Sequence, residues 1–78
     1  MDYTIHTPAQ LGQVLRGQRM AQGLTQKATG EPVGLLPKTV GRLENEPARS
    51  TVESLFKLLS ALNLELVIRP KSDQPSEW

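Results

Sequence analysis

The chain has no cysteine and very few aromatic residues, with one phenylalanine, one tyrosine and one tryptophan among 78 residues. The lack of cysteine excludes disulfide bonds and thiolate metal sites as sources of stability. A chain of this length buries only about 60% of the surface of its unfolded state, so its own core gives marginal stability. We therefore expect oligomerisation to stabilise the fold further.

Long hydrophobic runs and catalytic constellations are also missing. Apolar runs such as Leu66–Ile68 are far too short to span a bilayer, and Met1–Gln10 lacks the basic and then apolar order of a signal peptide. The only histidine, His6, has no cysteine or carboxylate cluster beside it, and no glycine-rich phosphate loop is present. We expect a soluble, cytoplasmic protein that is not an enzyme and binds no cofactor, metal, small molecule or membrane.

Positive charge is unevenly distributed, although the formal net charge is only +1. Between Pro8 and Leu43 the chain has five basic residues against one acidic residue, Glu31. The basic residues are Arg16, Arg19, Lys27, Lys38 and Arg42. Such a basic segment is typical of a nucleic-acid-binding surface.

Capping residues predict where the first helix lies. Thr7 and Pro8 are typical of a helix start, because the hydroxyl caps free N–H groups and proline at the first position loses no hydrogen bond. We expect this helix to run from Pro8 to about Gln22, with Gly23 as a left-handed cap. Its apolar residues recur with the helical period. They are Leu11, Val14 and Leu15.

Two shorter helices are predicted next. Thr25 is expected to cap the second helix, Gly34 to make a turn with positive φ, and Pro37 to begin a third helix that ends near Glu44. Pro32 lies inside the second helix, where it removes a backbone hydrogen bond. We expect the second helix to end early or to kink there.

A fourth helix is predicted after the loop at 45–47. Ser50 and Glu53 match a capping box, and Thr51 is the alternative cap. Apolar residues at helical spacing predict the buried face of this helix. They are Val52, Leu55, Phe56, Leu58, Leu59 and Leu62.

Residues 64–69 change to an alternating pattern, which predicts a strand stopped by Pro70. A single strand leaves its backbone N–H and C=O groups unpaired. Its partner is either Tyr3–Ile5 of the same chain or the same strand of a second subunit, and the second solution gives a two-fold homodimer more simply. The expected dimerisation residues are Leu64, Leu66, Val67 and Ile68.

The second and third predicted helices have small and apolar residues at set positions. A small residue falls at Gly30, where the two helices would cross, and glycine falls at Gly34 in the turn. Apolar residues fall at Val33, Leu35, Val40 and Leu43. With this spacing, residues 8–62 resemble the phage-repressor (Cro/C1, XRE) family of helix-turn-helix proteins. The resemblance implies a mainly α domain of four to five helices, to which the strand adds an intermolecular two-stranded β-lid.

The resemblance also implies which residues contact DNA. The third helix would lie in the major groove. Positions that read bases in the family fall on Pro37, Lys38, Thr39 and Arg42. Positions that contact phosphates fall on Thr25, Gln26 and Asn45, with the basic Lys27 beside them. The alternative for Lys38 and Arg42 is a solvated helix face.

The resemblance also implies a pair of residues with a structural role. In the family, an arginine seven residues before the motif's glutamine reaches the glutamate that follows the third helix, and these positions fall on Arg19 and Glu44. We expect the two side chains to form a buried ion pair.

Four short segments narrow the family further, namely Ile5–Leu11, Glu44–Pro47, Phe56-Lys57 and Glu77-Trp78. They look like the corresponding segments of the HipB-like antitoxins of HipA/HipB toxin–antitoxin modules. This similarity implies a homodimer that represses its own operon and binds a HipA-like serine/threonine kinase toxin. The implied organisation is an extended arm at 1–7, a DNA-binding domain at 8–63, a dimerisation strand at 64–69 and a partner-binding tail at 70–78.

The tail ends in the only tryptophan, Trp78. Tryptophan is a common interface anchor, and the resemblance implies that Trp78 inserts into a pocket of the kinase. The alternative is a free end or one that folds back on its own dimer. Two other functions stay open: an interaction-only antitoxin whose DNA reading is spoiled by Pro32 and Pro37, and a stand-alone phage-type repressor.

Overall fold

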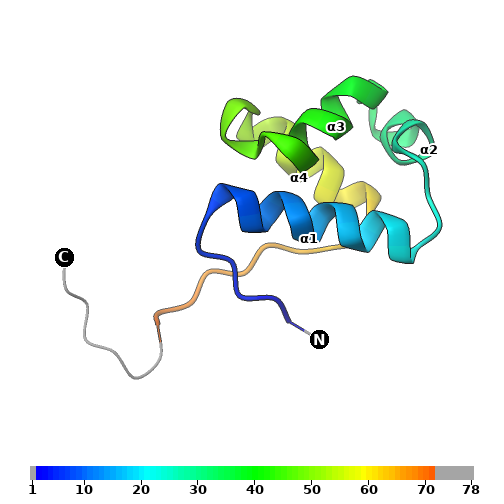
Figure 1. Cartoon of the computed structure of the whole chain (residues 1–78). Coiled ribbons are helices and arrows are strands. Elements are labelled where there is room, and N and C mark those ends of the chain that lie inside the picture. The colour runs from blue at the N-terminus through cyan, green and yellow to red at the C-terminus, as the bar shows by residue number, and fades with distance from the viewer. Residues whose placement is uncertain (1, 72–78) are drawn as a thin grey trace.

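The computed structural model describes residues 2–71, which contain four α-helices and two short 3-10 helices (Figure 1). The elements in chain order are α1 (Pro8–Ala21), α2 (Gln26–Gly30), η1 (Glu31–Val33), α3 (Pro37–Asn45), η2 (Pro47–Arg49) and α4 (Val52–Ala61). The prediction of a mainly α helix-turn-helix domain is confirmed.

Local backbone chemistry sets the limits of α1. Thr7 and Gln10 form a capping box, in which Gln10 N donates to Thr7 Oγ1 at 3.1 Å and Thr7 N donates to Gln10 Oε1 at 3.2 Å. Gly23 follows the helix with φ of 71°, as expected for a left-handed terminus. Both ends of the predicted helix are therefore confirmed.

The second helix ends early, as we predicted from the position of Pro32. The Thr25 hydroxyl caps α2 by accepting from Ala28 N at 3.0 Å. After Gly30 the chain continues as η1, because Pro32 has no N–H for an α-helical bond. Gly34 then turns the chain with φ of 74°.

The cap of α4 differs from the first prediction. Thr51, not Ser50, is the N-cap, and its hydroxyl accepts from Ser54 N at 3.0 Å. Ser50 instead ends η2, where its N–H donates to Pro47 O at 3.0 Å. The 3-10 turn thus delays the start of α4 by one residue, which the capping-box pattern could not show.

The core is built almost entirely of leucine. Buried apolar side chains from α1, α3, α4, the turn before α3 and the residue that caps the end of α4 meet in one cluster. They are Leu15, Leu35, Val40, Leu43, Leu58, Leu59 and Leu62. The motif residues Leu35, Val40 and Leu43 are buried as predicted, and Val33 packs against the cluster.

The predicted buried face of α4 is too wide. Val52 is 67% exposed and Phe56 is 50% exposed, while Leu58 and Leu62 are buried. One chain covers only one stripe of the helix, and six apolar positions occupy more than one stripe. Val52 and Phe56 therefore remain as apolar surface.

The predicted strand is not present in the described residues. Residues 64–69 and Tyr3–Ile5 form neither helix nor strand. Leu64 packs against the core, and its N–H donates to Leu59 O at 2.8 Å. The segment beyond it has no neighbouring strand within residues 2–71 to supply ladder hydrogen bonds, so alternation alone does not produce a strand.

The close approach of α1 to the end of α3 depends on Gly12. A Cβ atom built on Gly12 would collide with the Glu44 carbonyl oxygen and lie 3.0 Å from Pro47 Cγ. Gly17, in the same helix, has no atom within 4 Å of such a Cβ. The two glycines are therefore a matched pair, one required by packing and one not.

We predict that Gly12→Ala lowers the free energy of unfolding by about 1–3 kcal/mol, because the backbone of α3 must shift. Gly17→Ala should raise it by about 0.5–1 kcal/mol, because alanine favours the helix. Urea denaturation of both variants measures the difference. Equal effects of the two substitutions would show that α1 does not pack against α3 in this way.

Candidate nucleic-acid interface

The helix-turn-helix is held together by backbone proximity between α2 and the segment leading to α3. Leu35 N donates to Gly30 O at 2.9 Å. A Cβ on Gly30 would collide with the Leu35 carbonyl oxygen and lie 3.0 Å from Val40 Cγ2. Glycine at position 30 thus permits the turn to pack closely on α2.

The predicted base-reading residues lie on α3 away from the core. Pro37, Lys38 and Arg42 are exposed and Thr39 is partly buried. Lys38 and Arg42 are four residues apart, so they share one helix face. Among residues 2–71, the ion pairs involve other basic side chains, namely Arg19, Arg49 and Lys57. The α3 surface therefore presents two basic groups to solvent.

The residues expected at phosphates lie at the start of α2 and the end of α3. Lys27 and Asn45 are exposed, and Gln26 is partly buried. The Thr25 hydroxyl accepts the capping bond from Ala28 N at 3.0 Å, and the Thr25 carbonyl accepts from Thr29 Oγ1 at 2.8 Å. Thr25 thus has a clear structural task, and any role of its side chain at DNA stays a prediction.

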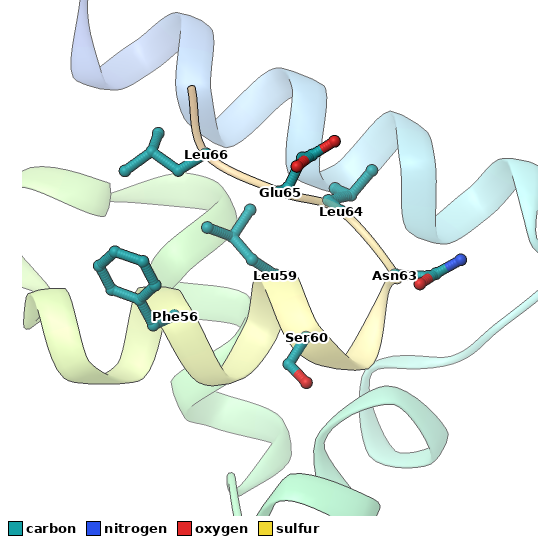
Figure 2. A pocket seen from close by; sticks show the side chains of 7 residues that line it. All are labelled: Phe56, Leu59, Ser60, Asn63, Leu64, Glu65 and Leu66. Carbon is teal, nitrogen blue, oxygen red and sulfur yellow. The ribbon is translucent and has the colours of Figure 1, made fainter. Parts of the chain in front are cut away.

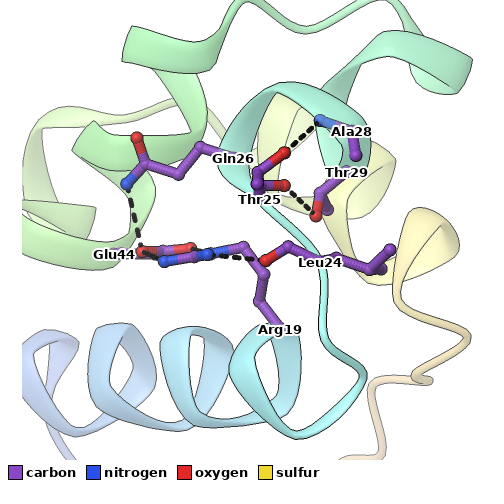
Figure 3. A network of polar contacts seen from close by, with 7 residues as sticks. All are labelled: Arg19, Leu24, Thr25, Gln26, Ala28, Thr29 and Glu44. Carbon is purple, nitrogen blue, oxygen red and sulfur yellow. Dashed lines mark hydrogen bonds and ion pairs between the residues drawn. The ribbon is translucent and has the colours of Figure 1, made fainter.

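Arg19 and Glu44 form the ion pair expected between them (Figure 3). Arg19 Nε donates to Glu44 Oε2 at 2.6 Å and Arg19 Nη2 donates to Glu44 Oε1 at 3.1 Å. A third bond runs from Arg19 Nη1 to Leu24 O at 2.8 Å. The side chains are only 12% and 1% exposed, and the hydrogen bond to Glu44 raises the pKa of Arg19.

Glu44 also holds Gln26, which the sequence did not predict. Gln26 Nε2 donates to Glu44 Oε1 at 3.3 Å, so one carboxylate joins α1, α2 and α3 (Figure 3). The amide lies over Gly41, where a Cβ would be 3.3 Å from Gln26 Nε2. Glycine at position 41 leaves the space that this amide occupies.

Sequence reasoning also overlooked Leu36. This residue is the N-cap of α3, makes no side-chain capping bond and is 62% exposed. The signal was available, since a leucine stands where a helix start favours serine, threonine, asparagine or aspartate.

An apolar surface lies between α4 and the segment after it. Phe56, Leu59, Leu64 and Leu66 contribute to a hollow of about 380 Å³ (Figure 2). Val67 and Ile68 follow it and are 67% and 91% exposed. Leu64 and Leu66 of the four expected dimerisation residues therefore line this hollow and the other two follow it in the chain, while Trp78 lies outside the described residues.

Two further site types can be assessed within residues 2–71. Every helix there is too short or too polar to cross a membrane. No group of three or more histidine, cysteine, aspartate or glutamate side chains gathers there to hold a metal ion.

Comparison with known proteins places the chain in a family. The model of the helix-turn-helix family named HTH_3 matches residues 7–68. Antitoxin HipB of Escherichia coli K12 is 30% identical over 64 residues, which cover 82% of this chain and 73% of HipB. Antitoxin HipB of Escherichia coli O6:H1 is 28% identical over 64 residues, which cover 82% of this chain and 68% of that protein.

Solved structures give the same relationship. A HipA-HipB-O2-O3 complex contains a chain of 27% identity that superposes with a TM-score of 0.87, covering 91% of this chain and 100% of that one. A chain of a HipB-O4 20mer complex is 28% identical and superposes with a TM-score of 0.85, covering 88% of this chain and 97% of that one.

We predict that Glu44→Ala lowers the free energy of unfolding by about 3–5 kcal/mol, because it strands the buried Arg19 charge. The control is Glu53→Ala, since Glu53 is 82% exposed and pairs with Lys57 at 3.8 Å. Its removal should cost less than about 1 kcal/mol. Thermal melts of both variants test the assignment, and equal losses would contradict it.

Proposed function

We propose that this chain, which belongs to the helix-turn-helix family and is a distant homologue of the HipB antitoxins, is an antitoxin that represses transcription of its own toxin–antitoxin operon. Membership of the family makes the chain a DNA-binding protein and not an enzyme. The observation that carries the proposal is the solvent face of α3. There Lys38 and Arg42 project without ion-pair partners among residues 2–71 from a helix whose other side is locked into the core.

In the proposed complex, α3 lies in the major groove with its first residues at the base edges. Lys38 and Arg42 donate to guanine O6 and N7, and the Thr39 methyl group contacts a thymine methyl group. These contacts give preference for one sequence. Gln26, Lys27 and Asn45 contact phosphates and fix the register of the helix on the duplex.

The bond from Gln26 to Glu44 supports this role for Gln26. The bond uses one amide hydrogen and leaves the second for a phosphate oxygen. Because the side chain is already held over Gly41, less conformational freedom is lost when DNA binds. Glu44 would thus stabilise the fold and orient a DNA contact with the same carboxylate.

The chain is proposed to act as a homodimer through the exposed surface of α4 and residues 64–69. Leu66, Val67 and Ile68 lie in a segment whose backbone groups make no hydrogen bond to other backbone groups of residues 2–71, and Phe56 adds apolar area beside it. Pairing of this segment with its copy in a second subunit would satisfy those groups and cover the apolar surface. The two paired segments would form the two-stranded lid.

The partner toxin is proposed to be a HipA-like serine/threonine kinase. Support comes from the relationship to HipB, since a solved complex contains HipA together with HipB. The residue proposed as the anchor is Trp78, because a single tryptophan on a polar tail suits an interface pocket.

We predict that the protein prefers the DNA upstream of its own gene over scrambled DNA, and that Lys38→Ala/Arg42→Ala lowers this affinity by about 100-fold or more. A binding titration at several salt concentrations measures both properties. The logarithm of the affinity should fall with the logarithm of salt concentration by about 0.9 per phosphate contact.

Lys57→Ala/Lys71→Ala is the matched control, because it removes the same charge from residues outside α1 to α3. It should leave the preference for the upstream DNA intact. Equal, weak binding of the wild type to both DNAs would instead support an interaction-only antitoxin.

A further prediction concerns the dimer. Leu66→Asp/Ile68→Asp should raise its dissociation constant by about tenfold or more, because two apolar side chains at the interface become charged. Both residues are exposed in the single chain, so helix content should not change. Analytical ultracentrifugation measures the constant, with the exposed neighbour Glu65→Ala as control. A wild-type protein that is monomeric would refute this interface. A dimer whose dissociation constant does not change with Leu66→Asp/Ile68→Asp would refute it as well.

A further inference from the structure

Leu36 is placed where it weakens α3. The helices α1, α2 and α4 each begin with a threonine whose hydroxyl accepts a hydrogen bond from the first turn. At the same position of α3, Leu36 makes no side-chain bond. A residue that cannot cap costs about 1 kcal/mol relative to serine, threonine, asparagine or aspartate. Leu36 therefore does not stabilise α3 as a capping residue would.

Packing does not explain Leu36 either. Its neighbour Leu35 is 9% exposed and Val40 is fully buried, but Leu36 is 62% exposed. Pro37 follows directly, is exposed and has no donor on its backbone or side chain. Leu36 and Pro37 thus make the start of α3 an exposed apolar edge, directly before the exposed Lys38.

The major groove of DNA offers one apolar group on its base edges, the C5-methyl group of thymine. A recognition helix brings its N-terminal residues closest to the bases. An exposed leucine at that point can contact a methyl group and exclude water from it, but it cannot hydrogen-bond any base. The chemistry of Leu36 therefore matches thymine and no other base.

We propose that Leu36 is a specificity-determining residue that reads a thymine methyl group in the operator, with Pro37 extending the apolar contact. This proposal rests on the proposed DNA-binding function. It adds a base-reading position before the first residue of α3 and gives the apolar start of the helix a purpose. The basic residues Lys38 and Arg42 then read neighbouring base pairs.

Replacing single operator thymines by deoxyuridine tests the contact, because this change removes only the methyl group. The upstream DNA that the wild type prefers is the probe. We expect one substituted position to lower wild-type affinity about three- to fivefold, as for one buried methyl group. Leu36→Ser should lower affinity for the thymine operator by a similar factor and show no further loss at that deoxyuridine.

Leu36→Ser also controls for folding, since serine supplies the missing cap and should keep or raise the melting temperature. Thr39→Ser removes only a methyl group from the other candidate reader, and it should remain sensitive to deoxyuridine at the position that Leu36 reads. Additive losses from Leu36→Ser and deoxyuridine at every thymine would overturn the role of Leu36 while leaving the repressor intact. A wild type without preference for the upstream DNA would sink both proposals.

Discussion

The buried ion pair between Arg19 and Glu44 is the interaction on which the arrangement of the helices depends. Two opposite charges at 2.6 Å, almost without access to water, are stable only together. Arg19 comes from the last turn of α1, and Glu44 from the last turn of α3. Any rotation of α3 that separated them would leave both charges buried and unpaired. The pair therefore restricts α3 to one orientation on α1.

The same carboxylate extends this restriction to α2 through Gln26, and Arg19 reaches the Leu24 carbonyl just before α2. Two glycines make the arrangement sterically possible. Gly12 lets α1 lie against the backbone of Glu44, and Gly30 lets the turn lie against α2. The ion pair and the close backbone packing thus hold α1, α2 and α3 together in the same region of the fold.

Features set by neighbouring residues could be predicted from the sequence. Local backbone chemistry determines the threonine caps, the glycines at positive φ and the early end of α2 at Pro32. The caps are Thr7 and Thr25, and the glycines are Gly23 and Gly34. The ion pair could not be derived this way, since 25 residues separate its members. Only the resemblance to the phage repressors suggested it.

Features that depend on what covers a surface were predicted poorly. The apolar pattern of α4 includes Val52 and Phe56, but the single chain covers neither. The alternation at 64–69 identifies a segment suited to a strand, yet a strand also needs a neighbour. Both errors occur at surfaces assigned here to the dimer. A sequence that encodes an interface therefore looks, within one chain, like a sequence with too many apolar residues.

The start of α3 follows the opposite logic. Leu36 and Pro37 provide neither a cap nor buried area, and Gly41 lowers helix propensity in the middle of the same helix. The fold tolerates these costs because Val40, Leu43 and the Glu44 ion pair hold α3 from its other side. With the helix fixed by its inner face, the outer face is free to carry residues chosen for what they contact. Local rules of stability are broken on the face of α3 that is proposed to contact DNA, and they are kept on the face that packs against the core.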